Sequence, residues 1–345
     1  MKAVVKSEPG PGHVHFVPDW PEPRPQPDEV KLEVAAAGIC GTDIHIINGT
    51  WRCDAPVVLG HEFCGTVVET GELVKNLHPG DRVVAANPAR TCGGCYYCRA
   101  GNPFMCRERV SAGYMIDGAF AEYIVIRAEM CHRLPENVSF RQAALGEPIS
   151  VAVHAAIERT TVHAGDVVLV SGVGCVGLLV LQVAKLEGAR VIIAGLEKDA
   201  RRLDCARKLG ADRVVNVDQE NLLEAVMEET GGAGADLVYE CAGSPKSLET
   251  CLEAVKRQGT LAPVGMYAGP VTVDINAISQ KELDVAGSYG YVWTSWERSL
   301  ALLSGGKIEA DMLISHEFPL EQYDAAFRTT QDGAGVKVIF RMQRI

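Results

Sequence analysis

Four cysteines in one short run carry the clearest chemical signal of the chain. They follow the spacing C-x2-C-x2-C-x7-C within fifteen residues, and four thiolates on a glycine-containing loop are the donor set of a closed tetrahedral zinc site. Bacterial ferredoxin motifs also open with C-x2-C-x2-C, but they continue with three residues and Cys-Pro, whereas here the fourth cysteine precedes Arg107. We therefore predict a structural zinc ion, without an open coordination position, held by Cys92, Cys95, Cys98 and Cys106.

A glycine motif in the second half of the chain indicates dinucleotide binding. Residues 172–177 read G-x-G-x-x-G, directly after the apolar strand pattern 167–171 and at the start of an apolar helical pattern. In such a motif the first glycine permits a tight turn, the second lets the backbone approach a pyrophosphate, and the third lets helix and strand touch. The helix N-terminus then offers free N–H groups to the phosphates. The predicted cofactor contacts here are Gly172, Gly174, Cys175, Val176 and Gly177.

The end of the next strand decides between NAD and NADP, because an acidic residue there binds the ribose diol and repels a 2′-phosphate. Gly195 occupies the strand end and would tolerate the phosphate, while Glu197, about twenty residues beyond the glycines, favours NAD. Lys198, Arg201 and Arg202 would attract a phosphate or form a solvated helix face. We expect NAD through Glu197 and keep NADP open.

A cysteine followed about twenty residues later by His-Glu completes a recognisable set. With Cys40 and the pair His61–Glu62, a four-cysteine loop and a dinucleotide motif, the chain resembles the zinc-dependent medium-chain dehydrogenase/reductase superfamily. The resemblance runs from Lys2 to Val338, and the run Gly146–Ala155 is most similar to the polyol branch, which includes sorbitol and threonine dehydrogenases. It implies a Rossmann-type parallel sheet, a mainly β GroES-like barrel, and two zinc ions per chain, one catalytic and one structural.

The resemblance also implies roles for individual residues. Cys40 and His61 match catalytic zinc ligands, and Glu62 matches an acidic residue that can enter the zinc sphere. Glu147 stands where alcohol dehydrogenases place a further cysteine and, as in polyol dehydrogenases, would ligate zinc or hold its water; which glutamate ligates stays open. A zinc with an open position activates an alcohol for hydride transfer to nicotinamide. Thr42 and His45 match the proton relay, which passes through the cofactor ribose.

Further matches are made by position along the chain. Asp43 matches the residue that supports the zinc-bound histidine. Segments lining the nicotinamide are matched around Ala242, Val264 and Ser288, and Lys337 matches a basic residue near the pyrophosphate.

The pattern of apolar residues divides the chain in two. The first 145 residues show short strands between Gly and Pro turns, among them Val30–Ala37 and Phe63–Thr70, with little helical periodicity. From Asp166 strands alternate with amphipathic helices, which predicts a parallel sheet covered on both faces. Residues 289–345 show one clear helix and a final strand. We predict an α/β protein with a catalytic zinc-binding domain of residues 1–149 and 289–345, and a dinucleotide-binding domain of residues 150–288.

Composition limits the possible partners. A chain of 345 residues is long enough for two domains, and its net charge of −11 argues against nucleic acid or an anionic membrane as a main partner. The start of the chain has no apolar signal-peptide core, and no run of eighteen apolar residues occurs. We expect a soluble cytoplasmic protein, with twelve reduced cysteines, that acts on a small-molecule alcohol as a homo-oligomer, a tetramer or dimer.

Two other classes of function stay in view. Members of the superfamily without zinc act as metal-free reductases or structural proteins, but the retained metal-ligand set argues against this. A zinc-ribbon nucleic-acid binder is the second, and the acidic balance argues against it. Within the enzyme reading, polyols, cyclitols, L-threonine and simple secondary alcohols all remain possible substrates.

Overall fold

The computed structural model describes residues 1–342, which form two compact units. Among the described residues, unit 1 comprises 1–147, 292–306 and 310–342, and unit 2 comprises 148–291 and 307–309. The sequence places the boundaries at 149/150 and 288/289, and the structure places them at 147/148 and 291/292. Within residues 1–342, no helix is both long enough and apolar enough to cross a membrane.

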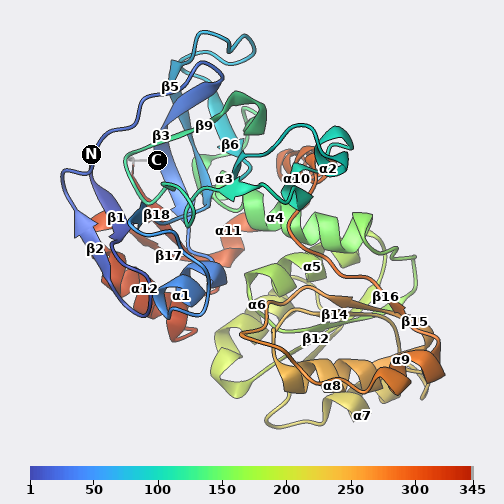
Figure 1. Ribbon diagram of the computed structural model, residues 1–345. Helices are drawn as coiled ribbons and strands as arrows, with labels where there is room; N and C mark the ends of the chain where they lie inside the picture. Colours follow the sequence, from blue (N-terminus) through green and yellow to red (C-terminus); the bar gives the residue numbers. More distant parts are fainter. Residues whose placement is uncertain (343–345) are drawn as a thin grey trace. The chain divides into compact units, whose positions relative to one another are not determined.

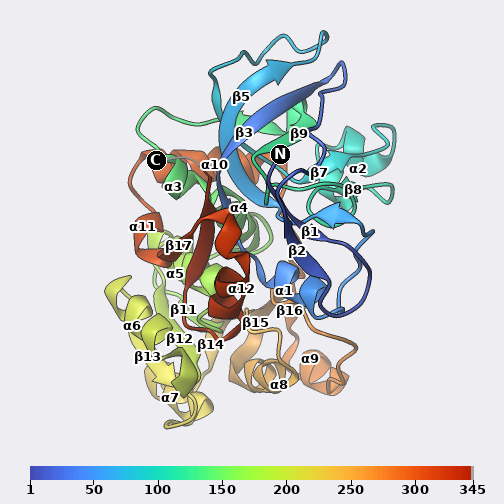
Figure 2. The ribbon, with the colours of Figure 1, turned by 90° about the vertical axis from the view of Figure 1, so that its left-hand side faces the viewer.

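Unit 1 is built on three mainly antiparallel sheets, in which only β17 and β18 pair in parallel. Its largest sheet has the order β10-β6-β5-β3-β18-β17, with β9 also paired to β3. Figure 2 shows the two longest strands, β3 and β5, running side by side. The strands of unit 1 are β1 (Ala3–Lys6), β2 (Val14–Val17), β3 (Glu29–Gly38), β4 (Val57–Val58), β5 (Glu62–Thr70), β6 (Arg82–Ala85), β7 (Pro88–Arg90), β8 (Val110–Ser111), β9 (Tyr123–Arg127), β10 (Cys131–Arg133), β17 (Ile314–Phe318) and β18 (Lys337–Arg341).

Unit 1 also contains helices of four to twelve residues. The helices that lie wholly within unit 1 are α1 (Gly41–Ile47), α2 (Tyr96–Arg99), α3 (Phe140–Ala143), α10 (Trp293–Ser304), α11 (Ala310–Leu313) and α12 (Tyr323–Gln331). The strands predicted at Val30–Ala37 and Phe63–Thr70 are confirmed as β3 and β5. The expectation of a single helix after residue 289 is wrong, because α11 and α12 follow α10. Helix α11 has four residues, too few to show a helical period, and the nine residues of α12 bury only Ala326 and Phe327.

Unit 2 is a doubly wound α/β fold. Its six strands are all parallel, in the order β13-β12-β11-β14-β15-β16. The elements are β11 (Val167–Ser171), α5 (Cys175–Leu186), β12 (Arg190–Gly195), α6 (Ala200–Lys208), β13 (Arg213–Asn216), α7 (Leu222–Glu229), β14 (Ala235–Glu240), α8 (Pro245–Ala254), β15 (Val255–Pro263), α9 (Ile275–Lys281) and β16 (Asp284–Val285). Helix α4 (Gly146–Val153) begins in unit 1 and ends in unit 2.

The strand order of unit 2 indicates where a ligand would bind. Figure 1 shows α5 and α6 on one face of the parallel sheet and α7, α8 and α9 on the other. The first and fourth strands of this sheet along the chain, β11 and β14, are neighbours, and the order of the strands reverses between them. In open parallel sheets ligands bind beyond the carboxyl ends of the strands at this reversal. The predicted Rossmann-type sheet is confirmed.

Candidate active site

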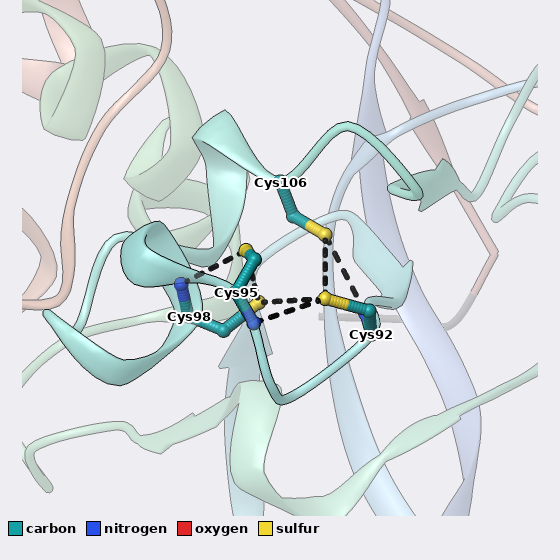
Figure 3. A group of neighbouring side chains, drawn as sticks. All are labelled: Cys92, Cys95, Cys98 and Cys106. Carbon is teal, nitrogen blue, oxygen red and sulfur yellow. Dashed lines mark hydrogen bonds between the residues drawn. The ribbon is translucent and has the colours of Figure 1, made fainter.

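The four cysteines of the loop 92–106 converge. Their Sγ atoms lie 3.5 Å apart for Cys95 and Cys98, 3.6 Å for Cys92 and Cys106, and 4.0 Å for Cys92 and Cys98. Figure 3 shows the four thiols turned toward one another. With zinc–sulfur bonds of about 2.3 Å, a tetrahedron has sulfur–sulfur edges of about 3.8 Å, while a disulfide has about 2.05 Å. The distances fit a tetrahedral zinc site and exclude a disulfide in this arrangement.

Local hydrogen bonds prepare these thiols for a cation. The backbone N–H of Cys95 donates to Cys92 Sγ at 3.3 Å, and that of Cys98 donates to Cys95 Sγ at 3.5 Å. The Cys98 N–H lowers the pKa of the Cys95 thiol to about 7. Burial and the Cys95 sulfur raise the pKa of Cys98 to about 11. Four thiolates cannot form together without a compensating charge, which a divalent ion supplies.

The second predicted ligand set also converges, in unit 1. Cys40 caps the N-terminus of α1, His61 directly precedes β5, and Glu62 is the first residue of β5. One ligand atom from each of these three residues lies within 4.8 Å of the others. His61 and Glu62 are buried, with exposed fractions of 4% and 1%. Sulfur, imidazole and carboxylate donors in this number leave a position open on a tetrahedral zinc.

Asp43 holds two of these ligands in place. Its Oδ2 accepts a hydrogen bond from the Cys40 backbone N–H at 2.8 Å, and its Oδ1 lies 3.5 Å from His61 Nδ1. Burial disfavours a charged imidazole, but the Asp43 carboxylate raises the pKa of His61 well above its usual value. With Nδ1 facing Asp43, Nε2 is the nitrogen left for a metal, as expected of a carboxylate–histidine–metal arrangement.

Lys337 lies beside the metal-ligand set of unit 1, a contact that the sequence did not predict. Its Nζ forms a buried ion pair with Glu62 and donates to the backbone carbonyl of Ile39 at 3.0 Å. A Cβ atom at Gly38 would lie 2.2 Å from Glu62 Oε2 and 2.8 Å from Lys337 Cε, so a larger residue at this position would require the buried ion pair to shift. The contacts of Lys337 described above are with Glu62 of the predicted metal-ligand set and with the backbone next to Cys40. Its contact with a pyrophosphate stays a prediction.

Glu147 belongs to the same electrostatic environment. It lies in the first turn of α4 and has an exposed fraction of 7%. Burial, and secondarily the Glu62 carboxylate, raise the pKa of Glu147 to about 8. A buried carboxyl group whose ionisation is opposed by burial and by a neighbouring carboxylate fits a site that receives a divalent cation.

The predicted relay residues lie on α1. Thr42 Oγ1 is 3.7 Å from Cys40 Sγ, and His45 follows Thr42 by three residues, which places both on one side of the helix. His45 Nδ1 lies 3.1 Å from Thr50 Oγ1. Both side chains are half-buried, as a path between an enclosed site and solvent requires.

In unit 2 the glycine turn fits a dinucleotide. Gly172 adopts φ +116°, and its Cβ would lie 2.7 Å from the Ala242 nitrogen, while a Cβ at Gly177 would lie 2.0 Å from the Gly172 carbonyl oxygen. Gly174, the N-cap of α5, has nothing within 4 Å of a Cβ position. The outer glycines are thus required by the fold, and the middle one faces the space that a pyrophosphate would fill. Cys175 and Val176 form the first turn of α5.

The other predicted cofactor contacts follow the carboxyl ends of neighbouring strands. Ala242 follows β14, Val264 follows β15 and Ser288 follows β16. The buried Ser288 hydroxyl has no hydrogen-bond partner among residues 1–342. The parallel sheet therefore brings the glycine turn and the loops after β14 and β15 to one edge.

Comparison with known proteins agrees with this architecture. Residues 26–136 match the alcohol dehydrogenase GroES-like domain, and residues 175–305 match the zinc-binding dehydrogenase domain. A sorbitol dehydrogenase from Halalkalibacterium halodurans is 40% identical over 340 residues, 98% of each chain. The chain belongs to the zinc-dependent medium-chain dehydrogenases. An L-threonine 3-dehydrogenase from Pyrococcus horikoshii is 37% identical over 99% of each chain.

A solved structure extends the comparison to the whole fold. A putative zinc-binding dehydrogenase from Sinorhizobium meliloti, bound to NADP, has a TM-score of 0.90 at 32% identity and covers 99% of each chain. This dehydrogenase is therefore an oxidoreductase that uses a nicotinamide cofactor and acts on an alcohol. The alternative of a zinc-ribbon nucleic-acid binder falls away.

The residues around Glu197, beyond the end of β12, form a small hydrogen-bonded group. Glu197 is exposed, and its Oε2 accepts from the side-chain amides of Asn216 and, at 2.6 Å, Gln219. Its backbone N–H donates to Asp218 Oδ2 at 2.7 Å. These three partners lie at or just beyond the end of β13 and were not predicted from the sequence. The meeting of adjacent parallel strands at one edge is the signal that points to them.

The basic residues beside Glu197 divide into two kinds. Lys198 and Arg201 are exposed, while the Arg202 guanidinium pairs with Asp199 at 3.1 Å. Three carboxylates and two side-chain amides thus lie around the turn after β12, together with the exposed cations Lys198 and Arg201.

Proposed function

We propose that this dehydrogenase oxidises a secondary alcohol of a polyol, at a zinc ion held by Cys40 and His61 with Glu62 or Glu147. The observation that carries the proposal is the buried convergence of Cys40, His61 and Glu62 within 4.8 Å, supported by Asp43 behind His61. When bound, zinc supplies Lewis-acid activation of the alcohol, and the nicotinamide cofactor accepts the hydride.

The protein's own residues prepare this chemistry. Asp43 fixes the imidazole so that Nε2 is available, and it holds the Cys40 backbone at the same time. Lys337 balances the charge of Glu62 in a buried setting. The Thr42 hydroxyl would accept the proton that the alcohol loses while it gives up its own proton, and His45, half-buried on the same helix, would take up the released proton and pass it to solvent.

A polyol is the substrate class we assign. The support is the 40% identity to a sorbitol dehydrogenase. The second support is Glu147, which stands where alcohol dehydrogenases have a cysteine, as it does in the polyol dehydrogenases that the chain resembles. L-Threonine is the second candidate, supported by the 37% identity to an L-threonine 3-dehydrogenase. An assay of cofactor reduction with polyols, cyclitols, L-threonine and short secondary alcohols tests the assignment. We expect the kcat/KM of a polyol or cyclitol to exceed that of L-threonine by at least about tenfold; the reverse order would assign the enzyme to amino alcohols.

We assign NAD as the preferred cofactor. Glu197 supports this, since Asn216 and Gln219 hold its Oε2 while its Oε1 has no partner among the described residues. A carboxylate fixed in this way would accept from the ribose diol and repel a 2′-phosphate. Gly195 and the exposed Lys198 and Arg201 are the opposing features.

Steady-state kinetics with both cofactors tests that assignment. The wild-type enzyme should have the higher kcat/KM with NAD, and Glu197→Ala should reduce this preference about tenfold, equivalent to about 1.4 kcal/mol. Lys198→Ala is the control variant, and it should leave the preference for NAD over NADP unchanged. A preference for NADP that Lys198→Ala weakens would reverse the assignment.

Two further properties complete the proposal. We place the protein in the cytoplasm, in keeping with its twelve cysteines, all of which are free thiols in the structure, and we assign it a homo-oligomeric state, a tetramer or dimer. Sedimentation of the purified enzyme tests the oligomeric state, and a monomer at assay concentration would refute it.

A further inference from the structure

Glu240, the last residue of β14, carries a fully buried carboxylate with four donors. Its exposed fraction is 0%. Oε1 accepts from the Ala242 N–H at 3.0 Å and the Ser247 hydroxyl at 2.7 Å. Oε2 accepts from the Gly243 N–H at 3.1 Å and the Tyr267 hydroxyl at 2.7 Å. Every donor is well placed, so the side chain satisfies the conditions under which a buried carboxylate is tolerated.

These contacts tie together loops that belong to different strands. Ala242 and Gly243 follow β14, while Tyr267 follows β15. The backbone carbonyl of Glu240 also accepts from the N–H groups of Val264 at 2.9 Å and Gly265 at 2.8 Å. Glu240 therefore fixes the loop after β14 and the loop after β15 through its side chain and its main chain together.

The same network reaches the strand that precedes the glycine turn. The Ser247 hydroxyl lies 2.8 Å from the Ser171 hydroxyl at the end of β11. Gly172 packs closely against the loop after β14, because a Cβ atom added to Gly172 would lie 2.7 Å from the Ala242 nitrogen. The position of the 241–243 segment thus sets the separation between the loop after β14 and the phosphate-binding turn, on either side of the reversal between β11 and β14.

We propose that Glu240 is a positioning residue for the nicotinamide cofactor, because it fixes the two loops that carry the expected contacts Ala242 and Val264. The proposal rests on the cofactor chemistry of the proposed function, and it holds for NAD and NADP alike. Glu240 itself is enclosed by protein donors and does not touch the cofactor. Its effect is to hold the crevice open at one fixed width before the cofactor arrives, which lowers the ordering cost of binding.

Asp236 offers a matched control on the same strand. It lies near the opposite end of β14, where its Oδ2 accepts from the Val167 N–H at 2.7 Å and its Oδ1 pairs with Lys256. Asp236 links β14 to strands β11 and β15, whereas Glu240 links β14 to the loops after β14 and β15. Only Glu240 lies at the carboxyl ends of the strands. A general loss of sheet stability should follow from either substitution, whereas a specific loss of cofactor binding should follow only from changing Glu240.

Glu240→Gln is the diagnostic variant. Each carboxylate oxygen accepts one backbone N–H and one hydroxyl; a hydroxyl can rotate, but a backbone N–H cannot. A glutamine places its NH2 group against the N–H of Ala242 or Gly243, so one of these loses its acceptor and is repelled. Tyr267→Phe is the milder second variant, which removes one donor and leaves the backbone contacts intact.

NADH and NADPH binding to the full-length zinc enzyme, followed by reduced-nicotinamide fluorescence, tests the proposal together with hydrogen exchange of the peptides over 241–247 and 264–268. For whichever cofactor the wild type binds, we expect Glu240→Gln to raise the Kd at least about tenfold and to speed exchange in both peptides. Asp236→Asn should leave the Kd within about twofold, and Tyr267→Phe should raise it about threefold. A Kd within twofold of wild type for folded Glu240→Gln would overturn the inference. If that variant does not fold, an unchanged Kd and unchanged exchange in Tyr267→Phe would overturn it. A wild type that binds neither cofactor would refute the proposed function itself.

Discussion

The Oδ1 atom of Asp43 lies 3.5 Å from Nδ1 of His61, and the other oxygen of the same carboxylate holds the Cys40 backbone at 2.8 Å. A single carboxylate therefore orients two of the predicted metal ligands, the N-cap residue of α1 and the residue before β5. Because residues behind metal ligands typically contribute 10- to 100-fold to metal affinity, Asp43 is the first position to test.

Asp43→Asn should weaken zinc binding at the Cys40–His61 set by about 10- to 100-fold. The amide loses the charge that favours the orientation of His61. Competition with a graded chelator measures the affinity, and the zinc of the four-cysteine loop serves as an internal control that should be retained. Equal chelator resistance in the variant and the wild type would show that Asp43 does not support the metal.

Gly38→Ala should destabilise unit 1 by about 1–3 kcal/mol, the usual cost of overpacking. The new Cβ would lie 2.2 Å from Glu62 Oε2 and would displace Lys337 from its buried ion pair. Gly41→Ala is the matched control, because nothing lies within 4 Å of its Cβ position. Urea denaturation measures both, and we expect the control to stay within about 0.5 kcal/mol of wild type. Equal effects of the two substitutions would refute the packing argument.

Gly174→Ala and Gly177→Ala should separate cofactor binding from stability. A Cβ at Gly177 would lie 2.0 Å from the Gly172 carbonyl oxygen, so this variant should lose about 2 kcal/mol or more. Gly174 has open space and an extended backbone, so its variant should keep its stability within about 0.5 kcal/mol but bind NADH at least about tenfold more weakly. Denaturation and NADH titration on each protein check this. Undiminished NADH affinity in Gly174→Ala would place the pyrophosphate elsewhere.

The sequence predicts most of unit 2 because its elements have strong local signals. Strands such as Val167–Ser171 are continuous apolar runs, and α5 follows a glycine motif with a known geometry. Helix α1 gave no such signal. It has seven residues, two of them buried, and its N-cap is the metal ligand Cys40, so too few positions exist to show a helical period.

The ligand residues of the candidate site follow from spacing and resemblance, but their supporting contacts do not. Lys337 reaches the carbonyl of Ile39 across 298 positions of the chain, and no local pattern specifies such a contact. Glu240 reads as the polar end of a buried strand, and only the fold shows that its four donors come from two loops and α8. Sequence spacing identifies candidate ligands that lie close together along the chain, whereas the contacts that support them depend on tertiary packing.

Glu147→Ala should lower kcat more than about tenfold while the protein stays folded. The buried carboxylate lies in the electrostatic environment of Glu62 and His61, where it would ligate zinc or hold its water. Turnover with the best polyol and thermal denaturation are to be measured together. A kcat within about threefold of wild type, less than one kcal/mol of barrier change, would instead assign Glu147 a structural role.

The central claim is that this dehydrogenase holds two zinc ions with different tasks, and zinc content measured alongside activity tests it most directly. The wild type should contain two zinc ions per chain. Cys40→Ser should retain one zinc and its fold but lose activity, and Cys98→Ser should lose the other zinc, since each substitution removes a thiolate from one of two separate sets. A fully active wild type with a single zinc ion, or an active Cys40→Ser variant with unchanged zinc content, would contradict the account.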